Sequence, residues 1–180
     1  WAWCPVFLDV DLDGDADLLV SSGYPHDVQD LDAVQEIAKR QHSWERFKDP
    51  IALKSAFAKE LMENYRLYPK LDMPLIAFEN QGNGTFREAT QTWGTHHPGV
   101  QQGCATGDLD GDGDQDLVVN NLNAPVSLYR NQTAAPRVKV HLTGAGSNTQ
   151  AIGARVVLQS TTMPDQQQEI IAGGRYVSGG

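Results

Sequence analysis

Two acidic stretches of nine residues share the pattern Asp-x-Asp-x-Asp-Gly-x-x-Asp in this chain of 180 residues. Carboxylates at alternating positions of a tight turn suit a hard cation, which takes six to eight oxygen ligands at roughly 2.3–2.6 Å. Without a cation, five aspartates within nine residues would repel one another. The residues concerned are Asp9, Asp11, Asp13, Asp15 and Asp17, and then Asp108, Asp110, Asp112, Asp114 and Asp116.

The position of each aspartate in the pattern predicts its role. Side chains at positions one, three, five and nine are expected to ligate the ion. Position seven (Asp15 or Asp114) is expected to offer its backbone carbonyl and to turn its side chain to solvent. Gly14 and Gly113 at position six permit the sharp turn. Ligation by oxygen alone favours Ca²⁺ over zinc or copper, and Mg²⁺ prefers a stricter octahedron. The sequence therefore predicts two Ca²⁺ sites.

An EF-hand is the first alternative for these loops. It needs a Glu at position twelve, where this chain has Val20 and Val119, and it needs flanking helices. The loops instead lead into Leu18–Val20 and Leu117–Val119, which are typical of buried strands. A second alternative, two acidic surface turns without a metal, is disfavoured by the regular spacing and the second copy. We expect calcium loops between β-strands.

The composition restricts the class of partner. The two loops hold ten of the 23 acidic residues, so the rest of the chain is close to neutral. No basic patch is available for nucleic acid or an anionic membrane, and no apolar run reaches the roughly 18 residues of a membrane span. Both ends of the sequence look cut, and we expect a piece of a longer protein.

An abrupt change of composition separates residues 25–71 from the β-like remainder. Asp30 or Asp32 is expected to cap a first helix, and Asp49-Pro50 to begin a second. The apolar stripes Leu31, Val34, Ile37, Ala38 and Leu53, Phe57, Leu61, Tyr65 predict a helical hairpin. Further strands are expected at residues 75–78, 117–120, 126–130, 138–142, 154–158 and 169–172, with a hairpin turn at 80–86.

The loops and the strands that follow them resemble the FG-GAP/VCBS repeats of the integrin α-subunit type of β-propeller. The segment Asn80–Phe86 is similar to the outer hairpin of such repeats. Ile152–Val156 and Gly173–Ser178 resemble the ASPIC/UnbV domain, which follows these repeats in many bacterial secreted proteins and in the cartilage acidic protein group. The later strands of that domain are missing here.

The resemblance implies a mainly β fold made of propeller blades with a helical-hairpin insertion and the start of a C-terminal β domain. The expected divisions are propeller repeats at 1–24 and 72–133, the insertion at 25–71, and a truncated ASPIC/UnbV domain at 134–180. Cys4 and Cys104 precede the two loops at similar distances. Equivalent places in neighbouring repeats could pair them as a disulfide, and two buried thiols are the alternative.

Other residue groups offer catalytic interpretations with simpler structural alternatives. His96 and His97 are adjacent, which suits a shared metal poorly on a strand. Glu79 and Glu88 could form an acid/base pair, but they also suit solvated strand edges. Trp3, Trp44 and Trp93 could line a sugar site, although we expect Trp3 and Trp93 in the core. We therefore predict no catalytic residues and no enzymatic activity.

Two classes of function follow. The first is a calcium-binding, non-catalytic recognition or scaffolding module of an exported β-propeller protein, with a protein or glycan ligand and the rest of the propeller as partners. The second is an accessory segment of a secreted polysaccharide-active or other enzyme whose chemistry lies elsewhere. A pocket with paired carboxylates of raised pKa would favour the second class. Weak calcium sites predict an extracellular, cell-surface or periplasmic location.

Overall fold

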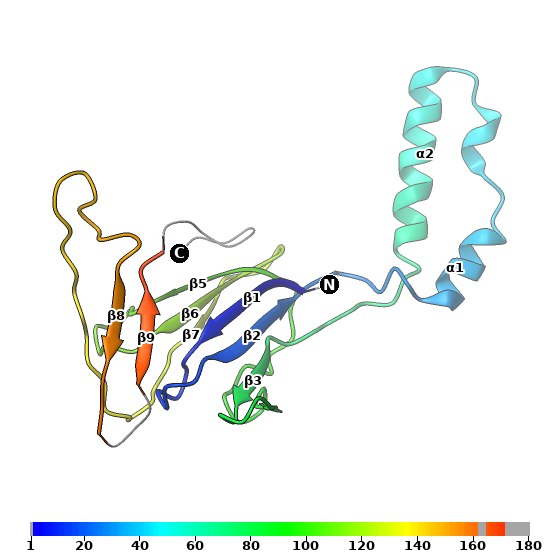
Figure 1. The fold of residues 1–180 in the computed structure, drawn as a ribbon. Coiled ribbons are helices and arrows are strands. Elements are labelled where there is room, and N and C mark those ends of the chain that lie inside the picture. Colours follow the sequence, from blue (N-terminus) through cyan, green and yellow to red (C-terminus); the bar gives the residue numbers. More distant parts are fainter. Residues whose placement is uncertain (1, 162–164, 172–180) are drawn as a thin grey trace. The chain divides into compact units, whose positions relative to one another are not determined.

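The computed structural model describes residues 2–161 and 165–171 and shows a mainly β chain (Figure 1). This agrees with the predicted fold class. The elements in chain order are β1 (Ala2–Leu8), β2 (Asp17–Ser22), α1 (Leu31–Ala38), the 3₁₀ helix η1 (Ser43–Arg46), α2 (Pro50–Tyr65), β3 (Ile76–Asn80), β4 (Phe86–Glu88), β5 (Gln101–Gly107), β6 (Asp116–Asn121), β7 (Ser127–Tyr129), β8 (Arg155–Leu158) and β9 (Gln166–Glu169).

The chain contacts divide it into two compact units. The first is Trp1–Gly23 with Met73–Gly180 and holds the sheets, and the second is Tyr24–Asp72 and holds the helices. The second unit covers nearly the same residues as the insertion expected from composition. The assignment of 134–180 to an ASPIC/UnbV domain stays a prediction.

Both acidic loops join two antiparallel strands. The first sheet has the order β1-β2-β3-β4 and the second has β5-β6-β7. Leu8 pairs with Asp17 across the first loop, and Gly107 pairs with Asp116 across the second. The ninth residue of each pattern therefore begins the strand that follows its loop. The EF-hand alternative is excluded, because strands and not helices flank both loops.

One apolar core is shared by the two sheets. Alternate residues of the strands point into it because side chains on a strand alternate between faces. Its buried members are Cys4, Val6, Leu19, Leu75, Ala77, Ala89, Cys104, Leu117 and Val119, and Trp93 packs against them. The Ser21 hydroxyl donates to the Gln102 carbonyl oxygen at 2.6 Å, which fixes β2 beside β5. Trp3 is half-buried, and its indole N–H donates to the Gly23 carbonyl oxygen at 2.6 Å.

The two helices begin where the sequence predicts. Asp30 caps α1 by accepting from the Ala33 N–H at 2.8 Å, and Asp49 caps α2 by accepting from the Ala52 N–H at 2.8 Å. Each cap satisfies a backbone donor that has no partner inside the helix. Pro50 occupies the first turn of α2, where its missing N–H costs nothing.

The predicted apolar stripes do not match the buried face of the helical unit. Leu31 on α1, and Phe57 and Leu61 on α2, are exposed, while Ala33 and Glu60 are buried. The reason is that η1 packs along α2, where Trp44 lies edge-on to Phe57 with the ring centroids 5.9 Å apart. His42, just before η1, contacts Glu60 at 2.9 Å. The expected hairpin of two helices is thus a packing of α2 with η1.

Two predicted strands near the end of the chain differ in the structure. Residues 138–142 form no strand, because no other strand pairs with them. Val138 and Val140 are exposed. The next two strands form a separate antiparallel pair, in which Arg155 faces Glu169 and Leu158 faces Gln166. The strand expected at 169–172 is replaced by β9 at Gln166–Glu169, and residue 172 lies outside the described residues, as does the 173–178 motif.

Candidate metal centres

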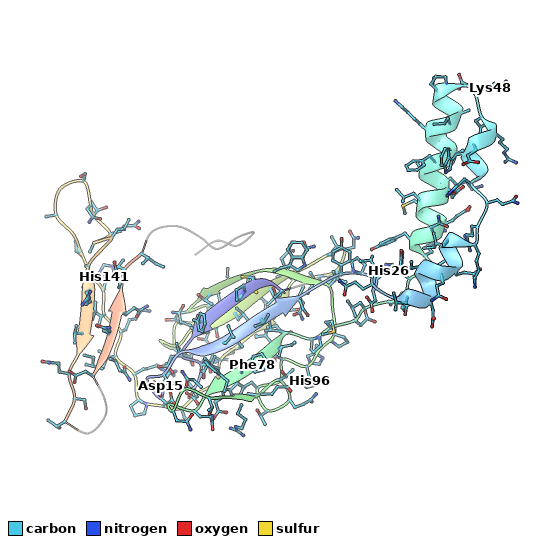
Figure 2. The ribbon with its side chains drawn as sticks, turned by 45° about the vertical axis from the view of Figure 1, so that its right-hand side comes forward. Asp15, His26, Lys48, Phe78, His96 and His141 are labelled. Atoms are coloured by element: carbon cyan, nitrogen blue, oxygen red, sulfur yellow. The ribbon has the colours of Figure 1, made fainter. Side chains whose placement is uncertain are left out.

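Each acidic loop gathers three carboxylates around one point. Single oxygen atoms of Asp9, Asp11 and Asp17 all lie within 4.8 Å of one another. The second loop does the same with Asp108, Asp110 and Asp112. Figure 2 shows Asp15 at the turn that joins β1 to β2. The first cluster thus uses positions one, three and nine of the pattern, and the second uses positions one, three and five.

The loop backbone is folded by the same aspartates that form the clusters. In the first loop, Asp9 accepts from the N–H groups of Asp13 and Gly14, both at 3.1 Å. In the second loop, Asp108 accepts from the Gly111 N–H at 2.8 Å, and Asp112 accepts from the Asp114 N–H at 3.1 Å. These short-range bonds turn the carboxylates inward, which assembles a set of oxygen atoms before any ion arrives.

Left-handed backbone occurs at positions four and six of both loops. Gly14 and Gly113 at position six have φ of 102° and 97°, as the sequence predicts. Position four has φ of 61° at Leu12 and 82° at Gly111. An L side chain in this region costs roughly 1–2 kcal/mol, so Leu12 holds strain that Gly111 avoids. The sequence pattern does not reveal this requirement, because the two loops have different residues there.

The ninth aspartates have a structural function besides any ligation. Asp17 is 1% exposed, and its two carboxylate oxygens accept from the N–H groups of Val10 and Asn80, both at 2.8 Å. Asp116 is also 1% exposed and accepts in the same way from Leu109 at 2.8 Å and Asn131 at 2.9 Å. Each carboxylate therefore closes its own loop and fastens the residue at or after the end of the sheet's third strand.

Burial changes the proton affinity of the first loop. Burial raises the pKa of Asp17 to about 6, although its two backbone hydrogen bonds act in the opposite direction. Burial also raises the pKa of Asp9 and of Asp11, with smaller contributions from the neighbouring carboxylates. Such shifts are expected where several acids share a partly desolvated site. A divalent cation would offset the negative charge of these carboxylates most directly.

Asp15 and Asp114 occupy position seven but differ in exposure. Asp15 is exposed, as predicted. The prediction that Asp114 turns its side chain to solvent is wrong, because this residue is 1% exposed and one of its carboxylate oxygens accepts from Arg137 at 2.7 Å. Its other oxygen is buried without a hydrogen-bond partner. The chain segment after β7 covers this side of the second loop.

The clusters fit a calcium ion on their donor chemistry. Two oxygens bound to one Ca²⁺ at roughly 2.3–2.6 Å can be at most about 5 Å apart, and the three oxygens of each cluster lie within that limit. All the donors are carboxylates, the ligands that hard cations prefer. Asp13 and Asp116 are not in the three-oxygen clusters, so their part in ligation stays a prediction, as does that of the carbonyls at Asp15 and Asp114.

Asn80 and Asn131 are functional residues that the loop pattern does not reveal. Besides its bond to Asp17, Asn80 donates from its side chain to the Ala16 carbonyl oxygen at 3.1 Å. Asn131 donates from its side chain to the Val10 carbonyl oxygen at 2.7 Å. The signal in the sequence is a short internal repeat, because Phe78-Glu79-Asn80-Gln81 and Tyr129-Arg130-Asn131-Gln132 place Asn-Gln two residues after an aromatic residue.

The residues considered for catalysis are exposed or form ordinary surface contacts. His96 and His97 have ring centroids 4.7 Å apart in an exposed loop, and the described residues bring no third metal ligand to them. Glu79 forms an ion pair with Arg87, and Glu88 is exposed on β4. These contacts are typical of a strand edge.

A cavity of about 410 Å³ lies beside the first loop. Its lining combines the aromatic side chains of Trp93 and Tyr129 with Asp11, Arg130 and several amides and hydroxyls. Asp11 is the single carboxylate among the lining residues, so the cavity lacks the paired carboxylates that would favour the enzyme alternative.

Comparison with known proteins identifies the repeat. Residues 71–119 match the model of the FG-GAP-like repeat family. The chain is 31% identical to cartilage acidic protein 1 of Mus musculus over 98 residues, which cover 54% of this chain and 15% of that protein. It is 30% identical to cartilage acidic protein 1 of Homo sapiens over 98 residues, which again cover 54% of this chain and 15% of that protein. The chain thus spans only a small part of these relatives, and no solved structure matches it.

Proposed function

We propose that this chain, which carries an FG-GAP-like repeat at residues 71–119, is a calcium-binding and non-catalytic module of a larger β-propeller protein. The observation that supports this best is the equivalence of the two loops. Each gathers three carboxylates within 4.8 Å, and each lies between two paired strands of a sheet. Bound calcium would offset the negative charge of these carboxylates.

The protein groups then have separate tasks. The aspartates at positions one, three and five would hold the two ions. They are Asp9, Asp11 and Asp13 in the first loop and Asp108, Asp110 and Asp112 in the second. Asp17 and Asp116 would transmit the order of each loop to the adjoining strands, since their carboxylates also accept from Asn80 and Asn131. An ion held by these carboxylates would differ from a catalytic zinc, which keeps an open position for water or substrate. The contribution of the bound ion is to shape and stability.

Recognition is the role that this architecture supports. The exposed loops and the cavity beside Asp11 offer polar and aromatic groups suited to a protein or glycan ligand. The helical unit also exposes large apolar side chains on α2, among them Ile51, Phe57, Leu61 and Met62. The alternative is an accessory segment of a secreted enzyme. Two observations count against chemistry within this chain. Glu79 is paired with Arg87, and the cavity lining has a single carboxylate.

The proposed calcium affinity also implies a location. Calcium sites of extracellular modules have Kd values of roughly 10⁻⁴–10⁻³ M, which cytosolic calcium would leave largely empty. We therefore propose that the protein works outside the cytoplasm, at the cell surface or in the periplasm. No helix in the described part of the chain is long and apolar enough to cross a membrane.

Calorimetric titration with calcium tests the proposal. Two sites are expected in the unchanged chain and one in either Asp11→Ala or Asp110→Ala. Because ligand binding stabilises the folded state, calcium at about 100 times Kd should add about 2.7 kcal/mol per site to the free energy of unfolding. Equal melting temperatures in calcium and in EDTA, together with no heat of binding, would contradict the proposal.

A further inference from the structure

The second acidic loop has three basic partners, all from the chain that follows β7. Arg130 Nε lies 2.5 Å from Asp110 Oδ2. Arg137 lies 2.7 Å from Asp114 and 3.6 Å from Asp112, through its two terminal nitrogens. Lys139 Nζ lies 2.8 Å from Asp108 Oδ2. We call residues 130–139 the basic segment.

The first acidic loop has the same pattern of aspartates but a different environment. Within residues 2–161 and 165–171, no lysine or arginine forms an ion pair with any of its five aspartates. The pKa values follow this difference. The Lys139 ammonium lowers the pKa of Asp108, whereas burial raises the pKa of Asp9 at the equivalent position. The protein itself neutralises part of the negative charge of the second loop but not that of the first.

The basic partners fall into two kinds according to what they contact. Asp108 and Asp110 are members of the three-oxygen cluster, so Lys139 and Arg130 each pair with a carboxylate that would hold the ion. Asp114 is outside that cluster, and its carboxylate is fully buried under Arg137. Arg137 has one partner of each kind, because it lies 3.6 Å from Asp112 in the cluster and 2.7 Å from Asp114 outside it. It can therefore keep its contact with Asp114 when an ion is bound. Lys139 and Arg130 have partners only in the cluster and would compete with the ion for their charge.

We propose that the basic segment is an internal competitor for calcium at the second loop. This inference rests on the calcium binding proposed above and adds the regulation of one of its sites. Arg137 anchors the segment, and Lys139 and Arg130 lower the affinity of the second loop below that of the first. Calcium that fills the second loop displaces Lys139 from Asp108 and loosens the chain that leads towards β8.

The size of the effect follows from the exposure of the pairs. The side chains of Lys139 and Arg130 are 73% and 62% exposed, so solvent screens both pairs. Exposed pairs of this kind change an equilibrium only a few-fold each. We expect the second loop to bind calcium about 3 to 10 times more weakly than the first, and the difference to shrink as salt rises.

NMR titration of the full 180-residue chain with CaCl₂ tests the proposal, with the amide signals of Gly14 and Gly113 reporting the two loops separately. Lys139→Gln should tighten binding at Gly113 about threefold and leave binding at Gly14 unchanged. Lys139→Arg should restore the weaker binding. Lys54→Gln is the matched control, since it makes the same change in net charge at an exposed residue of the helical unit. It should alter neither loop.

The outcomes separate this inference from the function on which it rests. If both loops bind calcium and Lys139→Gln leaves Gly113 unchanged, or weakens its binding, the competitor is refuted while calcium binding stands. If neither amide responds to calcium in the unchanged chain, the proposed function itself fails. The backbone amide signal of Lys139 gives a second readout in the unchanged chain. It should shift as calcium fills the second loop, and an unmoved signal would contradict the displacement of Lys139.

Discussion

Asn131 donates a hydrogen bond from its side-chain amide to the carbonyl oxygen of Val10, 121 residues earlier in the chain, at 2.7 Å. Its backbone N–H donates to Asp116 at 2.9 Å, and Val10 in turn donates its own N–H to Asp17 at 2.8 Å. A continuous set of hydrogen bonds therefore joins the ninth aspartate of one acidic loop to that of the other. The two candidate metal centres are braced against each other.

Asn131→Ala should weaken this brace. It removes the donor to Val10 but keeps the backbone bond to Asp116, so we expect a loss of about 1 kcal/mol in the free energy of unfolding. Denaturant unfolding measures this loss. The exposed Asn83→Ala is the control, and equal losses in both variants would argue against the brace.

Asp17→Ala and Asp11→Ala should separate the buried aspartate that fastens the strands from a less buried aspartate within the loop. Asp17 satisfies two backbone N–H groups and is 1% exposed, so its removal should cost about 1–3 kcal/mol for each group, even in EDTA. Asp11→Ala should cost little in EDTA and should abolish stabilisation by calcium at its loop. Thermal unfolding in EDTA and in calcium tests both. Similar melting temperatures for the two variants in EDTA would refute the division.

Gly23→Ala should destabilise the junction between β2 and β5. A Cβ built on Gly23 would lie 2.4 Å from the Gln101 carbonyl oxygen and 2.7 Å from its nitrogen, and neither backbone atom can move away cheaply. We expect a loss of about 1–3 kcal/mol or more. Gly107→Ala is a matched control, because a Cβ there meets nothing within 4 Å. Chemical unfolding of the two variants checks the difference.

His42 should make the helical unit sensitive to pH. Its hydrogen bond to Glu60, at 2.9 Å, raises its pKa above 6.5, and the charge of Glu45 acts in the same direction. A raised folded pKa means that the pair stabilises the unit fully below about pH 6.5 and loses this contribution as pH rises through the folded value. An NMR titration of the His42 ring should show the raised pKa, and Glu60→Gln should lower it. An unchanged titration in Glu60→Gln would contradict the assignment.

Replacement of residues 27–70 by a short Gly/Ser linker should leave both calcium sites intact. The two ends of the helical unit lie next to each other, because His26 and Lys70 form an antiparallel bridge and the Leu71 N–H donates to the Pro25 carbonyl oxygen at 3.2 Å. A few residues can therefore span the gap. Calorimetric titration of the shortened chain should still find two sites. Loss of both would mean that the helical unit supports the loops.

The sequence predicts the parts of this structure that depend on local patterns. The loop pattern predicts the turn, the strands on either side and the left-handed backbone at the glycines of position six. The caps at Asp30 and Asp49 are local as well. Asp114 is different, because its burial depends on Arg137, which lies 23 residues later. The buried face of α2 likewise depends on η1, and residues 138–142 alternate like a strand but meet no partner strand.

The bridge between His26 and Lys70 has a consequence for the order of folding. The strands β2 and β3 pair although the whole helical unit separates them in the chain, and closing a loop costs entropy that grows with its length. If the helical unit closes on itself first, only a short stretch of free chain remains between the two strands. A variant that unfolds this unit but keeps its length should therefore slow formation of the first sheet in stopped-flow refolding. The shortened chain should refold at least as fast as the unchanged one.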